Sequence, residues 1–348
     1  MKINAQRHFA KKQDSDKLLE RINYWTSERE RDLCEPIVPR SRTRVGAILE
    51  DRTSDGLRYE VELMLLTPAN YHYFIKYGKL ELLIMESIWE TSTGHWNLGQ
   101  LSPANCRNEL LEIVKIAKDK GIPTVYWFTK DNIYHDHYID FARNFDHVFC
   151  SDVSEVKKLE ADGVAAVWLP PCVQTCVHDQ MKGKIEKTIS VLFDGWADID
   201  KFNEHYPDIG EMLNNGLKVI ESRYQVIETR KKLINGNIDG ILGSVTQRGR
   251  LMAMHSAEKF LTFDKTASTR TTQIIMTLDA IAAGLPVIHC GALEIGDPRI
   301  NMVSISTPND VLAILRSPEN SKYMLPELPL ENTFNYAVNK IMEEVSRC

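Results

Sequence analysis

The chain has 348 residues, about twice the usual length of one domain, so it predicts two domains or one large one with an ample core. Hydrophobic residues make up 43% of it and charged residues 26%, proportions that exclude a disordered, collagen-like or coiled-coil protein. The 42 Lys and Arg against 48 Asp and Glu give a net charge of -6, which excludes the strongly basic balance of a dedicated nucleic-acid-binding protein.

Residues 1–44 are predicted to form an N-terminal helical extension. Apolar residues recur there with the spacing of one narrow helical stripe, at Leu18, Leu19, Ile22 and Trp25. The chain has no apolar stretch long enough for a signal peptide or a membrane-spanning helix. Its seven cysteines are irregularly spaced, unlike a disulfide framework. We therefore expect a cytoplasmic protein without a membrane span and with reduced cysteines.

Short apolar runs alternate with segments of helical periodicity over residues 45–170. The predicted strands are residues 45–49, 80–85, 123–128, 147–150 and 165–169. The predicted helices are residues 57–66, 105–120, 133–144 and 153–161. This alternation is typical of a parallel sheet with helices on both faces, so we predict a Rossmann-like N-terminal domain.

The same alternation returns after a polar linker at residues 171–187, which begins at Pro171. The predicted strands are residues 188–193, 217–220, 259–263, 286–290 and 302–305. The predicted helices are residues 202–214, 248–256, 271–283 and 309–315. Residues 188–329 therefore predict a second Rossmann-like domain. The last segment, residues 330–348, predicts a helix that packs either locally or against the first domain.

Polar side chains follow two of the predicted strands in the first domain. Ligands of open α/β sheets bind beyond the carboxyl ends of the strands, so these side chains are the candidates for chemistry. Glu86 opens a loop rich in hydroxyl and aromatic residues, and Asp131 and His135 follow the strand at 123–128. A carboxylate or imidazole at such a place can act as a general base if its pKa lies near the working pH. The alternative for His135 is an exposed helix residue.

A second candidate site lies at the start of the predicted helix 271–283. Thr269 and Thr271 suit a helix N-terminus, where free N–H groups and the dipole favour phosphate, and Arg270 can pair with a diphosphate through two hydrogen bonds. Asp279, two turns further on, can accept hydrogen bonds from a ribose diol. The alternative is an ordinary helix connection with capping threonines and a solvated aspartate.

The segment from Asp279 to Val287, Asp-Ala-Ile-Ala-Ala-Gly-Leu-Pro-Val, resembles the E-A-x-A-x-G-x-P-V signature of GT-B-fold glycosyltransferases, with Asp for Glu. The stretch from Ile241 to Arg248 resembles the loop that meets the nucleotide in these enzymes. The resemblance implies two Rossmann-like domains that face a cleft, with the nucleotide-sugar held by the C-terminal one. Of the residues in that domain it implies donor contacts for Gly243, Arg248 and Asp279.

Two motifs in the first half resemble the spore-maturation-protein (CgeB-like) glycosyltransferases. They are Glu-Ser-Ile-Trp at residues 86–89 and Ile-Pro-Thr-Val-Tyr-Trp at residues 122–127, and the resemblance as a whole covers about residues 45–310. The chain departs from the usual pattern where Met276 and Thr277 stand in place of an Arg, and where Thr271 stands at the first Glu of the retaining enzymes.

Two patterns that could suggest a metal are interpreted otherwise. Asp198-Ile-Asp200 matches a metal-binding D-x-D but falls at a predicted helix start, where Asp is a common cap. Cys172, Cys176 and His178 lack the four-ligand spacing of a structural zinc site. The GT-B resemblance implies that a helix dipole and basic groups stabilise the diphosphate, so no metal is predicted.

The sequence thus predicts a metal-independent, hexosyltransferase-type glycosyltransferase of α/β fold. Its donor would be a nucleotide-diphospho-sugar, with UDP as the nucleotide, and its acceptor a polar hydroxyl such as that of a glycan in polysaccharide biosynthesis. Two alternatives stay open: a sugar-phosphate or glycerol-phosphate transferase of capsule or teichoic-type polymer synthesis, and a non-catalytic scaffold on the same fold. A DNA acceptor is disfavoured by the net charge of -6.

Overall fold

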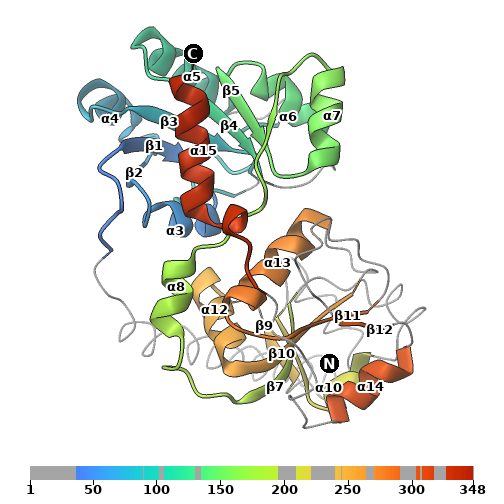
Figure 1. The fold of residues 1–348 in the computed structure, drawn as a ribbon. Coiled ribbons are helices and arrows are strands. Elements are labelled where there is room, and N and C mark those ends of the chain that lie inside the picture. Colours follow the sequence, from blue (N-terminus) through green and yellow to red (C-terminus); the bar gives the residue numbers. More distant parts are fainter. Residues whose placement is uncertain are drawn as a thin grey trace, which may run out of the picture. The chain divides into compact units, whose positions relative to one another are not determined.

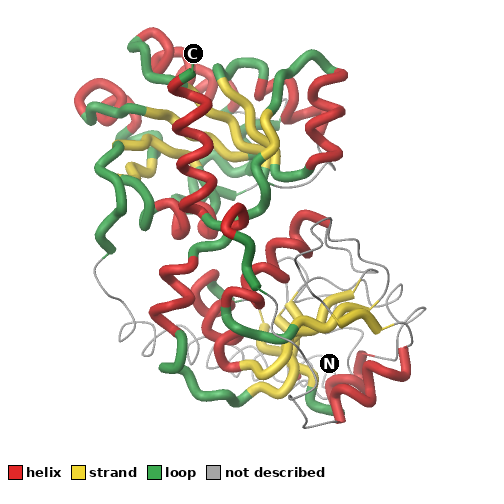
Figure 2. The backbone as a smooth tube through the Cα atoms, viewed as in Figure 1, coloured by secondary structure: helices red, strands yellow, loops and turns green. Residues whose placement is uncertain are grey.

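The structure, a computed structural model, divides into two compact units, each built on a parallel sheet (Figures 1 and 2). The first unit contains Pro36–Cys176, Arg270–Ile275 and Pro329–Cys348, and the second contains Val177–Thr269 and Met276–Leu328. The structure describes residues 37–88, 90–101, 106–129, 135–194, 209–220, 240–243, 245–263, 270–290, 303–305, 308–316 and 327–347. The predicted helical extension therefore lies almost wholly outside the described residues.

The sheet of the first unit has the strand order β2-β1-β3-β4-β5-β6, and all its pairings are parallel. Its strands are β1 (Arg44–Ile48), β2 (Glu62–Leu65), β3 (Leu82–Glu86), β4 (Thr124–Phe128), β5 (His147–Cys150) and β6 (Val167–Trp168). The helices are α3 (Asp51–Leu57), α4 (Tyr71–Tyr77), α5 (Arg107–Asp119), α6 (His135–Ala142) and α7 (Val153–Ala161). Every residue of β3 and β4 is buried, as expected for strands covered on both faces. The strand order reverses direction between β1 and β3.

The last helix of the chain packs on the sheet of the first unit. After η3 (Leu330–Asn332), α15 (Phe334–Ser346) buries Phe334, Ala337 and Ile341 in the core cluster that contains the strand residues Val45 and Trp127. Figure 1 shows α15 lying across this sheet. The spacing of the three buried residues is that of one helical face, which explains why this short helix needs the sheet to be stable.

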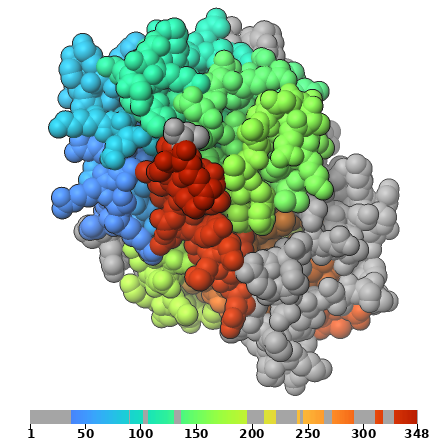
Figure 3. All heavy atoms as spheres, turned by 45° about the horizontal axis from the view of Figure 1, so that its top comes forward, coloured from blue at the N-terminus to red at the C-terminus, as the bar shows by residue number. Residues whose placement is uncertain are grey.

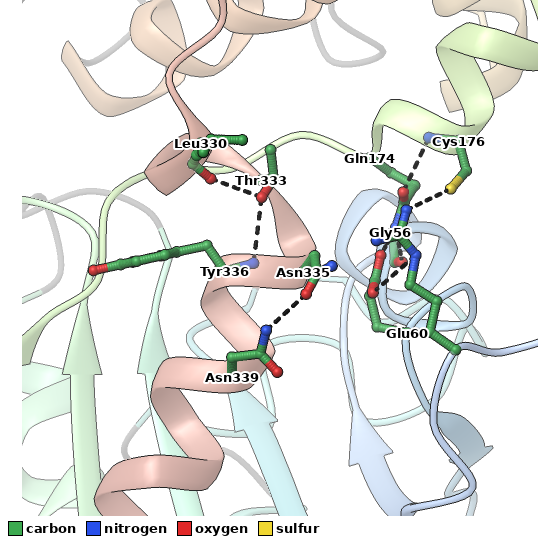
Figure 4. A network of polar contacts seen from close by, with 10 residues as sticks. Gly56, Glu60, Gln174, Cys176, Leu330, Thr333, Asn335, Tyr336 and Asn339 are labelled. Carbon is green, nitrogen blue, oxygen red and sulfur yellow. Dashed lines mark hydrogen bonds and ion pairs between the residues drawn. The ribbon is translucent and has the colours of Figure 1, made fainter.

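Polar contacts hold two segments of the first unit in place, the one around Gln174 and the start of α15 (Figure 4). Gln174 Nε2 donates to the Gly56 carbonyl (2.8 Å) and to Glu60 Oε1 (2.9 Å). At the start of α15, Thr333 Oγ1 donates to the Leu330 carbonyl (2.7 Å) and accepts from the Tyr336 N–H (3.3 Å). The contact with the Tyr336 N–H is an N-cap, which satisfies an N–H that the helix itself leaves free.

The sheet of the second unit has the strand order β12-β11-β10-β7-β8-β9, also all parallel. Its strands are β7 (Ile189–Asp194), β8 (Leu217–Ile220), β9 (Ile241–Gly243), β10 (Ala257–Phe263), β11 (Val287–Cys290) and β12 (Val303–Ile305). The helices are α8 (Thr175–Met181), which begins in the first unit, α10 (Ile209–Asn214), α12 (Gln247–Ser256), α13 (Arg270–Ala282) and α14 (Pro308–Arg316). Counted from β7, this is the Rossmann order 3-2-1-4-5-6, which reverses direction between β7 and β10.

The predicted α/β class with two Rossmann-like domains is confirmed, but one predicted helix is wrong. Residues 57–66 do not form a helix; α3 ends at Leu57 and β2 occupies Glu62–Leu65. The strand is an edge strand of four residues without a β-branched side chain, so it carries little local signal. Among the helices of the described residues, none combines the length and apolar character needed to cross a bilayer.

Candidate functional site

A small pocket lies at the reversal point of the first unit, at the carboxyl ends of β1 and β3. The polar side chains that line it include Glu50, Arg52, Thr53, Glu86, Thr129 and Ser151. Reversal points of open parallel sheets are where such folds bind ligands, because the flanking connections leave on opposite faces there. The cavity volume is about 20 Å³, room for one water. A ligand larger than a water molecule would therefore contact only the rim of this pocket.

Glu86 is the predicted base that the structure places at this pocket. Its carboxylate is 1% exposed and accepts hydrogen bonds from the Glu50 N–H (3.0 Å), from Thr53 Oγ1 (2.9 Å) and from Thr129 Oγ1. Three donors hold the carboxylate in one orientation. Gln100 Nε2 donates to the Glu86 carbonyl (2.6 Å) and holds its backbone as well. Glu86 thus ties the two strands of the reversal point together.

The other two predicted bases are less well located. Asp131 lies outside the described residues. His135 is the first residue of α6, and its side chain is also outside the described part. Of the three candidate bases, Glu86 is therefore the one whose side chain the structure describes.

The reversal point of the second unit carries a buried ion pair that the sequence analysis missed. Asp194 ends β7, and its Oδ2 lies 3.2 Å from Nη1 of Arg250 on α12. Burial raises the pKa of Asp194 to about 6, an effect that Arg250 opposes and the charge of Asp279 reinforces. The sequence did carry a signal that could have identified Asp194, because it is an acidic residue at the end of an apolar run, Ile-Ser-Val-Leu-Phe-Asp.

Arg248 stands at the N-terminus of α12, two residues before Arg250. Thr246 caps this helix by accepting from the Gly249 N–H (3.1 Å). The Nε and Nη2 atoms of Arg248 are buried, and neither has a hydrogen-bond partner within the described part of the chain. Buried donors without acceptors are costly, so an anion bound here would stabilise the protein. Gly243, the other predicted donor residue of this region, ends β9.

The predicted phosphate and ribose residues of α13 are only partly described. Thr269 and the side chain of Arg270 fall outside the described residues, and Thr271 is 3% exposed in the first turn of α13. Asp279 is 2% exposed, and its Oδ1 lies 3.7 Å from Nε2 of His178 on α8. A ribose contact by Asp279 would require this pair to open.

His178 links Asp279 to a second histidine. Its Nδ1 is 3.2 Å from Nε2 of His255, the ninth residue of α12. Burial, with a further effect of the His178 charge, lowers the pKa of His255 to about 3, so this imidazole is neutral at physiological pH. The Asp198-Ile-Asp200 triplet lies outside the described residues.

Comparison with known proteins gives a likeness of fold. No protein-family model matches the chain, and no curated protein sequence matches it. Among solved structures, the Anabaena protein HepE in complex with UDP and glucose is 9% identical, with 88% of this chain and 92% of that chain covered and a TM-score of 0.50. AviGT4, a glycosyltransferase involved in avilamycin A biosynthesis, is 12% identical, with 88% and 97% covered and a TM-score of 0.47.

The chain has a GT-B-type fold. A further structure of this kind, T4 phage BGT in complex with its UDP-glucose substrate, is 9% identical, with 88% and 97% covered and a TM-score of 0.43. In GT-B terms, the pocket at Glu86 belongs to the N-terminal sheet, and the Arg248 and Asp194 cluster belongs to the C-terminal sheet.

Proposed function

We propose that the chain is a glycosyltransferase that moves a sugar from a nucleotide-diphospho-sugar, with UDP as the nucleotide, to a hydroxyl of a polar acceptor. The observation that carries the proposal is the Arg248 guanidinium, whose Nε and Nη2 atoms are buried and have no hydrogen-bond partner among the described residues. It lies at the N-terminus of α12, and Arg250 of the same helix turn reaches Asp194 at the reversal point of the sheet. A helix N-terminus with a cation suits a diphosphate.

The chemistry follows from this placement. Cleavage of the sugar–diphosphate bond leaves negative charge on the diphosphate, and Arg248 with the free N–H groups of α12 would stabilise it. Arg270 and the N–H groups of Thr269 and Thr271 are proposed to contact the same diphosphate, and Asp279 the ribose. Glu86, Asp131 or His135 is proposed to deprotonate the acceptor hydroxyl. The motifs shared with the CgeB-like glycosyltransferases support membership of that family.

Replacing Arg248 by methionine is expected to abolish stabilisation by nucleotide. The native state should gain ~2.7 kcal/mol from a ligand at about 100 times its dissociation constant, and thermal unfolding with UDP, GDP, ADP, CMP or dTDP measures this gain. Without ligand, the variant should melt at or above the wild-type temperature, because the substitution removes buried donors that lack partners.

The matched control is Arg316→Met on α14, an exposed arginine of the same unit. It should keep the full nucleotide effect. If no nucleotide stabilises the folded wild-type protein, the donor site is absent and the scaffold alternative takes its place. A response to CMP alone would instead favour the sugar-phosphate transferase.

A further inference from the structure

A second, wider pocket lies at the opposite end of the first unit's sheet from Glu86. It is lined by Arg42, Arg44, Glu62, Lys79 and Glu81, at the amino ends of β1 and β2 and just before β3. Its volume is about 490 Å³, within the range of small-molecule sites. Nothing in the proposed transfer reaction uses these residues.

Two of the cations in this pocket have no partner among the residues that the structure describes. Arg44 has partners within the pocket. Its Nε lies 3.1 Å from Glu62 Oε2, and its backbone N–H donates to Glu81 Oε1 (3.1 Å). Arg42 and Lys79 are exposed, and neither makes an ion pair or a side-chain hydrogen bond within the described part of the chain. The pocket therefore offers free positive charge beside two fixed carboxylates.

Lys79 is also held in an unfavourable backbone conformation. It follows Gly78, the C-cap of α4, and has a φ of 52°. The left-handed position after a helix normally takes glycine, and a residue with a Cβ is strained there. A lysine kept at this position at the expense of stability points to a role for its charge.

An exposed pair of tyrosines adjoins the pocket. Tyr73 and Tyr77 lie one turn apart on α4, are 62% and 59% exposed, and have ring centroids 5.4 Å apart. The Gly78 carbonyl, which follows Tyr77 in the chain, accepts from Arg44 Nη1 (3.5 Å), so the end of α4 that carries Tyr77 lies next to the pocket. The blue to light-blue segment that contains β1, β2 and α4 forms part of the outer surface in Figure 3.

We propose that this surface binds an acidic glycan, a carbohydrate chain that carries carboxylate or phosphate groups. Exposed tyrosine rings can pack against sugar rings, and Arg42 and Lys79 can pair with the anionic groups. Glu62 and Glu81 can accept hydrogen bonds from the hydroxyl groups of the sugar rings, and the two exposed tyrosine rings are the feature of this surface that favours a carbohydrate. The inference that this glycan is the acceptor rests on the proposed transferase function; the binding itself does not.

Affinity electrophoresis of the full chain in native gels tests the proposal. Polygalacturonate in the gel should retard the protein, and dextran, a neutral glycan, should retard it far less. Arg42→Ala and Lys79→Ala should each weaken the binding about tenfold, as expected for the loss of a hydrogen bond between charged groups. Tyr73→Ser combined with Tyr77→Ser should weaken it as well. Lys120→Ala combined with Lys157→Ala, which removes two exposed lysines elsewhere on the unit, should not.

Lys79→Gly separates the charge of the lysine from a structural role. It should weaken binding as much as Lys79→Ala does, yet raise the unfolding temperature above that of the wild type, because glycine relieves the strain of the left-handed conformation. If Lys79 had only a structural role, Lys79→Gly would instead bind polygalacturonate at least as well as the wild type, because it would be the more stable protein.

Several outcomes would overturn the proposal. These are no retardation by polygalacturonate, equal retardation of the tyrosine variant, or stronger binding to single-stranded DNA or to vesicles containing phosphatidylserine. The transferase proposal is tested apart from it, since Arg42→Ala should keep the nucleotide-induced thermal shift and Arg248→Met should keep the retardation by polygalacturonate.

Discussion

Replacing Phe334 by alanine is expected to lower the free energy of unfolding by ~3–5 kcal/mol. Phe334 is the first residue of α15 and is 2% exposed. Its ring lies edge-on to Trp127 of β4, with centroids 6.2 Å apart, and fills the space over Gly56 of α3. The substitution leaves a cavity where three elements of the first unit meet. Urea unfolding followed by tryptophan fluorescence measures the loss.

A double-mutant cycle with Gly56 tests the same contact from the other side. A Cβ at Gly56 would stand 2.3 Å from Cε2 of Phe334, so Gly56→Ala in the wild type should cost ~1–3 kcal/mol. In the Phe334→Ala background the clash is gone, and the same substitution should stabilise α3 because alanine favours helix. Additive effects of the two substitutions would contradict this packing. Tyr336→Ala, on the exposed side of α15, is the control and should cost little.

The strongly patterned elements could be predicted from the sequence. The strands β3 and β4 are continuous buried apolar runs, and α13 was predicted at 271–283 and lies at Arg270–Ala282. Short elements with weak patterns could not be predicted. The edge strand β2 was assigned to a helix, and the seven-residue α4 and α8 were not assigned to any element. Their stability comes from tertiary packing, which a local pattern does not record.

Which residues meet at the candidate site depends on the order of the strands in each sheet, and the periodicity of a sequence does not reveal that order. Glu86 was predicted because it follows an apolar run, but its donors come from Glu50 and Thr129, 36 and 43 residues away in the sequence. Asp194 and Arg250 became candidates only when β7 and β10 were seen to be neighbours. The strand order reverses between β7 and β10, which explains why two ordinary-looking residues meet where a ligand would bind.

Asp194 and His255 are expected to give opposite and partly cancelling dependences of stability on pH. The pKa of His255 is about 3 in the native protein, below its ordinary value of 6.5, because of burial and then the charges of His178, Lys187 and Lys182. Between these two values the unfolded chain binds a proton that the native protein does not. The free energy of unfolding therefore falls as the pH falls through this window, by ~1.4 kcal/mol per pH unit.

Asp194 acts in the other direction. Its pKa is about 6 in the native protein against an ordinary 3.8, because of burial, with Arg250 opposing and Asp279 reinforcing the shift. Between these values the native protein binds a proton that the unfolded chain does not, so the free energy of unfolding rises as the pH falls from about 6 to about 4. Between about pH 6 and about pH 4 the two slopes cancel. Asp194 and His255 together should therefore add little to the pH dependence of the free energy of unfolding of the wild type.

Conservative variants are expected to expose each slope. With Asp194→Asn, the free energy of unfolding should fall below that of the wild type as the pH is lowered from 6 to 4, by ~1.4 kcal/mol per unit. With His255→Gln, which keeps a hydrogen-bonding group beside His178, it should rise relative to the wild type over the same range. Urea unfolding at a series of pH values gives both differences. Parallel curves for the wild type and both variants would show that neither group is shifted by its buried surroundings.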